Sequence, residues 1–226
     1  MIPGPFEYHA PTTLDEALEL LAQHGDDAKV LAGGQSLIPL MRFRLAQPAR
    51  LIDLKGVPGL SYIEQDNGWL RIGSMTREVA LDRSADVQAS FPLLAETAAV
   101  IADPLVRNLA TVGGNLAHAD PANDHPAAML AYRAEVVVRV PPGARTIAID
   151  DFFAGAFTPN INADELVTEI RIPSPGTRSG GAYEKLERKV GDYAIAAAAV
   201  QLTLAEDGTV SQVGIATTNV SFDMQR

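Results

Sequence analysis

The sequence contains no cysteine among its 226 residues. This absence excludes disulfide bonds, a cysteine nucleophile and a cysteine-ligated iron–sulfur cluster within the chain. Serine does not supply a substitute nucleophile, because no G-x-S-x-G elbow surrounds Ser36, Ser61 or Ser74. We therefore expect no covalent catalysis by a side chain of this protein.

Long apolar runs and clusters of basic residues are also missing. No uninterrupted apolar run reaches the ~18 residues needed to span a bilayer, and the N-terminal MIPGPFEYHAP lacks a signal core. The net charge is −10 and no block of Lys or Arg occurs, whereas nucleic-acid binding depends on cations that neutralise phosphates. We expect a cytoplasmic protein with no membrane-spanning segment and no nucleic-acid partner.

The pattern that is present predicts a mixed α and β protein. Thr13 and Glu16 have capping-box spacing ahead of an amphipathic stretch that ends at Gly25, which predicts a helix over 14–24. Further elements are expected as strands at 28–33, 50–54, 68–73 (closing a hairpin), 134–140 and 165–173, a helix at 91–102, and a turn or short helix at 36–44.

The alanine-rich stretch after residue 194 leaves helix and hairpin open, and the pattern VQLTL, AEDG, TVSQVGI favours the hairpin. Proline and glycine residues between 173 and 181 mark the best candidate for a domain boundary.

Two glycine pairs are the first candidates for a binding function. LAGGQS and TVGGN share a scheme of double glycine beside short polar side chains, and we call residues 32–36 and 111–115 the first and second glycine motifs. One such pair alone favours a tight turn. Two pairs favour one long ligand with phosphates, because glycine lets backbone N–H groups approach an anion. The P-loop and the G-x-G-x-x-G signatures are absent. If the ligand is a nucleotide, it is therefore bound by a fold that uses neither signature.

Titratable residues crowd the segment after the second glycine motif. His118, Asp120, Asp124 and His125 include metal-ligand types, but their spacing matches no standard site, and the two prolines Pro121 and Pro126 predict a non-helical path. We disfavour a metal site. Asp124 is a better acceptor for a ligand's sugar hydroxyl, with a plain loop-capping aspartate as the open alternative.

The stretch YEKLERKVGDYA, residues 183–194, also has two interpretations. It can be a solvated amphipathic edge. Alternatively, Tyr193 can lie against an aromatic ligand ring with Lys185 near the charge of the ligand.

Three stretches together resemble the FAD-binding medium subunit of molybdenum hydroxylases, most of all the carbon monoxide dehydrogenase type. They are KVLAGGQSLIPLMRFRLAQPARLIDL, IADPLVRNLATVGGNLAHADPANDHPAAMLA and AYEKLERKVGDYAIAAAAV. The combination A-G-G-x-S, T-x-G-G-N and a downstream P-x-x-D is specific, and the likeness covers nearly the whole chain.

This resemblance implies an α+β fold: a two-lobed FAD-binding domain of the PCMH or vanillyl-alcohol-oxidase type, followed by a partial C-terminal domain that begins with antiparallel strands. The implied parts are residues 1–57, 58–177 and 178–226. It also implies an FAD site whose residues are, in chain order, Lys29, Ala32, Gly33, Gly34, Gln35, Ser36, Ile101, Thr111, Gly113, Gly114, Asn115, Asp124, Lys185 and Tyr193.

The resemblance assigns the first glycine motif to the pyrophosphate, with Lys29 leading into it, and makes the second a further contact with FAD. Asp124 is expected on the ribityl or ribose part, Ile101 in the apolar wall of the ring system and Tyr193 beside the isoalloxazine, with Lys185 near it. No catalytic residue and no metal ligand are expected in this chain.

The resemblance further implies partners. Electrons would leave a molybdenum cofactor on a large subunit, cross two 2Fe-2S clusters on a small subunit and reach FAD here, before passing to an external acceptor. A dimer of heterotrimers is expected. Carbon monoxide is the favoured substrate of the complex, with a purine, an N-heterocycle or an aldehyde as alternatives.

Two other functions stay open from the sequence. The chain can be a stand-alone PCMH-type flavin oxidoreductase, such as an enolpyruvyl-sugar reductase, or a scaffold subunit that has lost its flavin. Family members continue past the point where this sequence ends, so we expect either a truncated form or a natural variant with an incomplete C-terminal domain.

Overall fold

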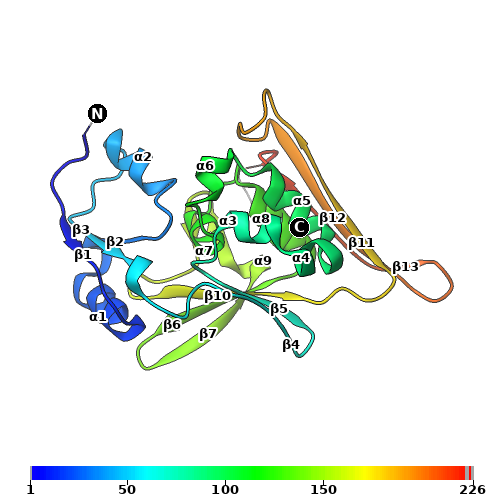
Figure 1. The fold of residues 1–226 in the computed structure, drawn as a ribbon, viewed down its shortest axis with the longest axis horizontal. Coiled ribbons are helices and arrows are strands. Elements are labelled where there is room, and N and C mark those ends of the chain that lie inside the picture. Colours follow the sequence, from blue (N-terminus) through cyan, green and yellow to red (C-terminus); the bar gives the residue numbers. More distant parts are fainter. Residues whose placement is uncertain (1, 222–223, 225–226) are drawn as a thin grey trace.

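The computed structural model describes residues 2–221 and residue 224. Its strands form a three-stranded sheet of order β1-β3-β2, a five-stranded sheet of order β4-β5-β10-β6-β7, a three-stranded sheet of order β11-β12-β13 and a β8-β9 ribbon. In Figure 1, most of the helices lie between the five-stranded sheet and the third sheet, while the first sheet forms a separate lobe with α1 and α2.

The strands are β1 (Glu7–His9), β2 (Ala28–Leu31), β3 (Arg50–Asp53), β4 (Ile63–Asp66), β5 (Trp69–Gly73), β6 (Glu135–Val140), β7 (Gly143–Ala148), β8 (Phe153–Gly155), β9 (Thr158–Pro159), β10 (Leu166–Pro173), β11 (Ser179–Leu186), β12 (Ala196–Leu204) and β13 (Val210–Thr218). The helices are α1 (Leu14–His24), α2 (Leu37–Arg42), α3 (Glu78–Arg83), α4 (Ala85–Ser90), α5 (Pro92–Val100), α6 (Pro104–Arg107), α7 (Val112–His118), α8 (Asp124–Tyr132) and α9 (Ile149–Phe152), with short 3-10 turns at Gly25–Asp27 and Leu54–Gly56.

The N-terminal lobe contains the predicted capped helix. The hydroxyl of Thr13 accepts the N–H of Glu16 at 3.2 Å, and the Glu16 carboxylate accepts the N–H of Thr12 at 2.8 Å. The buried face of α1 packs on the parallel strands β2 and β3. The same apolar cluster also includes residues from beyond the lobe, and these are Leu60, Met75 and Leu166. The first sheet is therefore joined to the rest of the molecule by a shared core.

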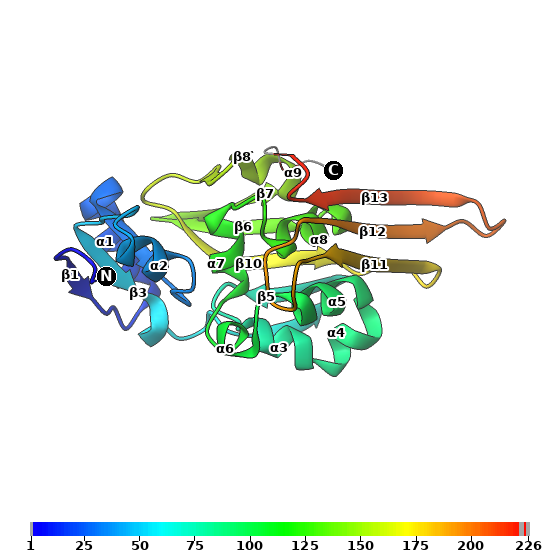
Figure 2. The ribbon, with the colours of Figure 1, turned by 90° about the horizontal axis from the view of Figure 1, so that it is seen from above.

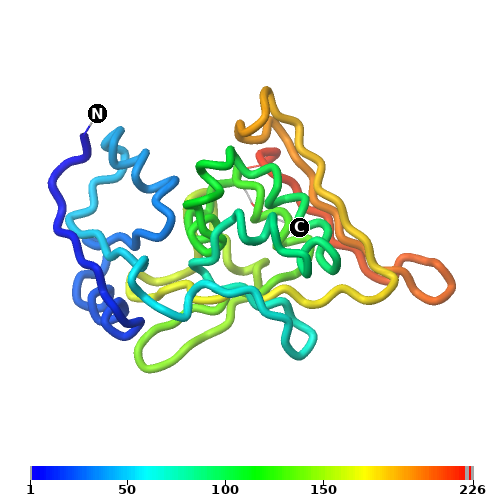
Figure 3. Tube along the Cα trace, viewed as in Figure 1, coloured from blue at the N-terminus to red at the C-terminus, as the bar shows by residue number. Residues whose placement is uncertain are grey.

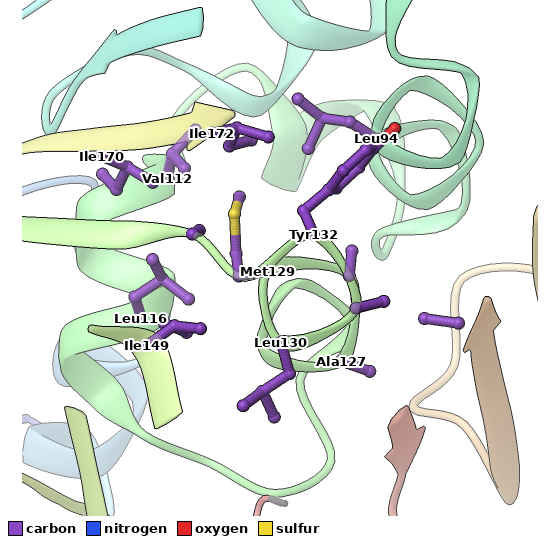
Figure 4. Packing of buried hydrophobic residues seen from close by; sticks show 14 of the residues in the cluster. Leu94, Val112, Leu116, Ala127, Met129, Leu130, Tyr132, Ile149, Ile170 and Ile172 are labelled. Carbon is purple, nitrogen blue, oxygen red and sulfur yellow. The ribbon is translucent and has the colours of Figure 1, made fainter. Parts of the chain in front are cut away.

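The main core lies above the five-stranded sheet. All of its strand pairs are antiparallel, and the inward-facing Ile170 and Ile172 of β10 are fully buried. Figure 4 shows Met129 of α8 reaching toward this sheet, with Tyr132 near Leu94 of α5. Every residue of α8 is buried, so this helix is the centre of the packing.

Most of the predicted elements are confirmed. The helices at 14–24 and 92–100, the hairpin of β4 and β5, and the strands β2, β3, β6 and β10 lie where the pattern placed them. The alanine-rich stretch is strand β12, which pairs with β13 in the favoured hairpin. Residues 174–178 connect the five-stranded sheet to this third sheet, as the chain trace in Figure 3 shows.

The path predicted after the second glycine motif is wrong. Residues 112–118 and 124–132 form helices α7 and α8, although glycines and prolines argued for loops. Thr111 caps α7 with its side chain. Pro126 lies in the first turn of α8, where a proline does not remove an intrahelical hydrogen bond. Among the described residues, no helix has the length and apolar character needed to cross a membrane.

The third sheet packs directly on α8. In Figure 2, its strands run beside this helix. The inward face carries small residues, including Ala199 and Ala216, which are almost fully buried. At Gly214 of β13 the approach is so close that a Cβ would lie 2.9 Å from the carbonyl carbon of Ala131. This glycine is therefore required by packing between backbones.

We predict that Gly214→Ala lowers the free energy of unfolding by about 1–3 kcal/mol, because the added methyl group must push β13 away from α8. The matched control is Gly180→Ala on β11, where an added Cβ meets nothing within 4 Å. The control is expected to change stability by less than about 0.5 kcal/mol. Urea unfolding of both variants measures the difference, and equal losses would contradict this packing account.

Candidate functional site

The first glycine motif follows β2 and leads into α2. Gly34 has a φ of +74°, a conformation that favours glycine. The carbonyl groups of Gly34 and Ser36 accept the N–H groups of Ile38 and Leu40. By contrast, no acceptor in the described part of the chain is paired with the N–H groups of residues 33–37. Consecutive free N–H groups of this kind form a concave site for an anion.

The first glycine motif touches the chain just before the second. A Cβ on Gly33 would collide with the carbonyl oxygen of Leu109 and lie 2.8 Å from the Cα of Ala110. A Cβ on Gly114 would lie 3.6 Å from the Cβ of Ala32. The structure therefore brings together two motifs that lie about eighty positions apart in the sequence.

The second glycine motif has a different local role. It is the first turn of α7, and its N–H groups already have acceptors. Gly113 donates to the Ser74 carbonyl at 2.9 Å, and Gly114 donates to the hydroxyl of Thr111 at 3.2 Å. A Cβ on Gly113 would lie 2.8 Å from the Cα of Ser74. Gly33 and Gly113 thus each allow close contact with another backbone segment, and the expectation that both glycine pairs make room for phosphates stays a prediction.

Two buried polar atoms near the second motif have no partner among the described residues. They are the side-chain oxygen of Asn115 and the hydroxyl of Ser74. The Asn115 backbone carbonyl, in contrast, accepts the side-chain N–H of Asn123 at 3.1 Å. An unpaired buried polar atom costs free energy, about 1–3 kcal/mol. Such atoms are expected where a ligand supplies the missing hydrogen bond.

Asp124 belongs to a buried polar cluster. Its two carboxylate oxygens accept hydrogen bonds from the Tyr183 hydroxyl at 2.7 Å and from the Lys185 ammonium at 3.0 Å. The Tyr183 hydroxyl also lies 3.0 Å from that of Thr218, and Lys185 donates to the Val100 carbonyl at 3.0 Å. The cluster ties the start of α8 to β11, β13 and the end of α5.

Burial dominates the electrostatics of this cluster. It raises the pKa of Asp124 above its ordinary value, although Lys185, the Tyr183 hydroxyl and His125 act in the opposite direction. Burial and the Asp124 charge also raise the pKa of Tyr183 strongly, so Tyr183 stays a hydrogen-bond donor at neutral pH. Lys185 is thus the cation that compensates the buried carboxylate.

Two predicted ring-binding residues, Ile101 and Tyr193, lie close to this cluster. Ile101 is buried directly after α5, next to the Val100 carbonyl that Lys185 contacts. Tyr193 is exposed, in the segment between β11 and β12. Its pKa is nevertheless raised, first by partial desolvation and then by the charges of Asp120 and Asp124. Lys29 is more distant in structure, exposed on β2 with Leu51 as its partner on β3.

The candidate metal residues do not converge. Among the described residues, no group of three or more His, Asp or Glu side chains is arranged to hold a metal ion. His125 is fully buried and its Nε2 lies 2.6 Å from a carboxylate oxygen of Glu78, which is also fully buried. His118 lies 4.0 Å from Asp120 and its ring packs near Phe157. The contacts of His125 and His118 are therefore separate pairs.

Sequence reasoning missed Ser74, Asn123 and Tyr183. Ser74 lies directly after a strand end, and only the fold brings it to the second glycine motif. Tyr183 and Lys185 are two residues apart on β11, so they share one face of the sheet. A strand predicted over residues 179–186 would have indicated that both side chains point in the same direction, which in the structure is toward Asp124.

We predict that Lys185→Met lowers the free energy of unfolding by about 3 kcal/mol, because it leaves the buried Asp124 carboxylate without its counter-ion. The double variant Asp124→Asn with Lys185→Met should recover part of this loss, since no buried charge remains. Arg188→Met is the matched control. Its partner Asp192 lies at 3.0 Å, but the Arg188 side chain is 78% exposed, so a loss below about 1 kcal/mol is expected. Chemical unfolding of the four proteins measures these differences, and equal effects of the two single variants would contradict the assignment.

The arrangement fits a dinucleotide with an aromatic ring system. Free N–H groups at residues 33–37 suit phosphate oxygens, and the unpaired oxygen of Asn115 suits a ligand donor. Ile101 follows the Val100 carbonyl that Lys185 contacts, and Tyr193 lies near enough to the Asp124 cluster for the Asp124 charge to raise its pKa. The residues present are therefore compatible with FAD.

Comparisons with known proteins agree with this interpretation. The family described as FAD binding domain in molybdopterin dehydrogenase matches residues 4–175. The chain is 49% identical to the carbon monoxide dehydrogenase medium chain of Hydrogenophaga pseudoflava over 98% of this chain and 77% of that protein. It is 47% identical to the corresponding chain of Afipia carboxidovorans over 98% and 76%.

A solved structure has the same fold. The structure of carbon monoxide dehydrogenase from Hydrogenophaga pseudoflava, which lacks the Mo-pyranopterin moiety of the molybdenum cofactor, matches with a TM-score of 0.96 and 49% identity. The match covers 100% of this chain and 78% of that chain. The protein therefore belongs to the family of FAD-binding medium subunits of molybdopterin dehydrogenases, as a flavoprotein subunit of the carbon monoxide dehydrogenase and xanthine dehydrogenase family of oxidoreductases.

Proposed function

We propose that this chain binds FAD and passes electrons from iron–sulfur clusters on a partner subunit to an external acceptor, within a carbon monoxide dehydrogenase-like complex. FAD, when bound, supplies the redox chemistry, since it can receive electrons singly and pass on a pair. The residues of this chain bind and orient the cofactor. No catalytic acid or base from this chain takes part in the proposal.

The observation that carries the proposal is the first glycine motif with its unpaired N–H groups, in contact with the segment that leads to Asn115. Residues 33–37 would hold the pyrophosphate. The side chain of Asn115 would hydrogen-bond to the cofactor, because its buried oxygen has no partner among the described residues. Thr111, Gly113 and Gly114 would act by fixing α7 against the first motif rather than by donating their own N–H groups.

The rest of the predicted site enters the proposal in two roles. Ile101 and Tyr193 would lie against the isoalloxazine, as an apolar wall and an aromatic neighbour. Lys185 holds Asp124 in place at 3.0 Å, and Asp124 would accept a hydrogen bond from a ribityl or ribose hydroxyl with its remaining lone pairs. Lys29 would act only through the charge it adds near the first motif.

The proposed partners are an iron–sulfur small subunit with 2Fe-2S clusters and a large subunit with the molybdenum cofactor, arranged as a dimer of heterotrimers. The absence of cysteine supports this division, since the clusters must be on another chain. Carbon monoxide is the proposed substrate of the complex, because two relatives with 49% and 47% identity are medium chains of carbon monoxide dehydrogenase.

We further propose that the α+β fold is a two-lobed domain of the PCMH type, with parts at residues 1–57 and 58–177. Residues 178–226 would begin a C-terminal domain with the antiparallel strands β11 to β13. The link at residues 174–178 supports the second boundary. A cytoplasmic location stays a prediction from the sequence.

We predict that Asn115→Ala weakens FAD binding about tenfold, because one hydrogen bond to the cofactor is lost. The free energy of unfolding without FAD should stay equal or rise, since the variant removes a buried oxygen that has no partner. Exposed Asn162→Ala is the control and should change neither property. Fluorescence titration with FAD and urea unfolding measure the two effects. A stability loss with unchanged FAD affinity would instead make Asn115 a purely structural residue.

The test of the proposed function is an absorbance spectrum of the chain purified alone and together with its co-expressed partner subunits, each after incubation with FAD and removal of the excess. We expect bands near ~450 and ~370 nm from bound flavin, and bleaching of these bands by carbon monoxide only when the partners are present. Flavin reduction by another substrate without partners would support a stand-alone enzyme. A chain that holds no flavin even with its partners would be a scaffold, and the proposal would be wrong.

A further inference from the structure

The turn between α5 and α6 is held through its carbonyl groups. The guanidinium of Arg107, on α6, donates to the carbonyl of Ile101 at 2.9 Å and to that of Ala102 at 3.1 Å. The carbonyl before these, of Val100, accepts a hydrogen bond from the Lys185 ammonium at 3.0 Å. Two cations therefore bind three consecutive carbonyl groups, and hydrogen bonds from charged donors are stronger than those from neutral ones.

The N–H groups of this turn are free. No acceptor in the described part of the chain is paired with the N–H groups of residues 101–103. The turn therefore has its carbonyls bound to cations of the protein and its donors unpaired, and the first glycine motif also has unpaired donors at residues 33–37. Donors of this kind suit the carbonyl oxygens and acceptor nitrogens of an isoalloxazine ring.

Ala102 has a backbone conformation that its surroundings must support. Its φ is +44°, which is uncommon for a residue with a Cβ. Such a conformation persists where neighbouring contacts fix it. The Arg107 side chain provides such a contact, since it is 15% exposed and its Nε lies 3.9 Å from a carboxylate oxygen of Asp82 on α3. Arg107 thus ties the turn to α3.

A second contact connects this turn to the other predicted ring residue. Gly191, in the segment between β11 and β12, has a φ of +90°, and a Cβ on it would lie 3.3 Å from the carbonyl carbon and oxygen of Ala102. Tyr193 follows two positions later. Ile101 is part of the turn and Tyr193 is next to the segment that packs on it. The conformation of the turn therefore affects both residues that we propose to lie against the isoalloxazine.

We propose that Arg107 is a positioning residue of the flavin site, which holds the turn between α5 and α6 so that its free N–H groups donate to the isoalloxazine. The inference rests on the proposed function, because the turn acts in this way only with a flavin beside Ile101 and Tyr193. Arg107 acts through the backbone, since it donates to the carbonyls of Ile101 and Ala102. Hydrogen bonds to the ring strengthen as the ring gains electrons, so these donors would raise the reduction potential of the flavin.

Variants of the full chain, prepared with the co-expressed partner subunits, test this role. Arg107→Met should weaken the binding of oxidised FAD about tenfold and that of reduced FAD by more, so the reduction potential of the bound flavin should fall. Arg107→Lys keeps a cation that can donate to the same carbonyls and should retain most of the affinity and the potential. Adding Ala102→Gly to Arg107→Met should recover part of both, because glycine adopts a positive φ without steric cost.

Arg145→Met is the matched control. Arg145 lies on β7, the edge strand of the five-stranded sheet. It also donates to a backbone carbonyl, that of Asn160 at 3.0 Å, and its Nε lies 2.7 Å from a carboxylate oxygen of the buried Glu165. Its loss should therefore lower the stability of the protein, but leave the FAD affinity and the reduction potential unchanged.

Fluorescence titration with FAD, spectroscopic redox titration of the bound flavin and urea unfolding without FAD measure the three properties. Loss of affinity and potential in Arg107→Met, with recovery by Lys or by Ala102→Gly, supports the proposal. An Arg107→Met variant that loses stability as the control does, with FAD affinity and potential of the wild type, would overturn it and leave the proposed function intact. Loss that neither Lys nor Ala102→Gly recovers would also overturn it. If the wild-type chain bound no FAD even with its partners, the proposed function would fail instead, and with it this inference.

Discussion

The contact between Gly33 and the backbone of Leu109 and Ala110 is the constraint on which the rest of the site depends. It is a meeting of two backbone segments with no side chain between them, and only glycine permits it. Because of it, the free N–H groups after β2 face the segment that begins α7. The N-terminal lobe also shares an apolar cluster with Leu60, Met75 and Leu166, so its orientation is fixed by packing as well as by this contact. A cofactor bound to both segments would add a third link between the lobes.

The remainder of the site is organised by buried polar pairs. Asp124, with Lys185 and Tyr183, connects α8 to β11 and to the end of α5. Glu78 and His125 form a second buried pair, which connects α3 to α8. Since these groups lie in the interior, each pair holds its elements in one arrangement, and loss of one member leaves a charge or donor unpaired. Lys185 also donates to the Val100 carbonyl, next to Ile101. In the proposed site, these buried pairs would position the cofactor by fixing the elements around it.

The sequence predicted the fold where the local pattern agreed with the tertiary environment. The capping box at Thr13, the period-two strands and the β12-β13 hairpin are examples, because each has a strong local signal. Residues 111–126 show the limit. Glycine and proline argued for a loop there, but burial of the whole of α8 outweighs weak helix propensity. The partners of Asp124 and Gly113 lie more than thirty positions away in the sequence, and spacing alone does not determine such contacts. The resemblance predicts which residues form the site, and the structure shows how the two glycine motifs differ.

Hydrogen exchange at the two glycine motifs, measured residue by residue with and without FAD in the presence of the partner subunits, tests the central claim most directly. The N–H groups of residues 33–37 have no acceptor in the described protein, while those of Gly113 and Gly114 have the Ser74 carbonyl and the Thr111 hydroxyl. The account predicts fast exchange at 33–37 that slows at least about tenfold when FAD binds, and slow exchange at 113–114 in both states. Unchanged exchange at 33–37, with new protection at 113–114 on FAD binding, would contradict it.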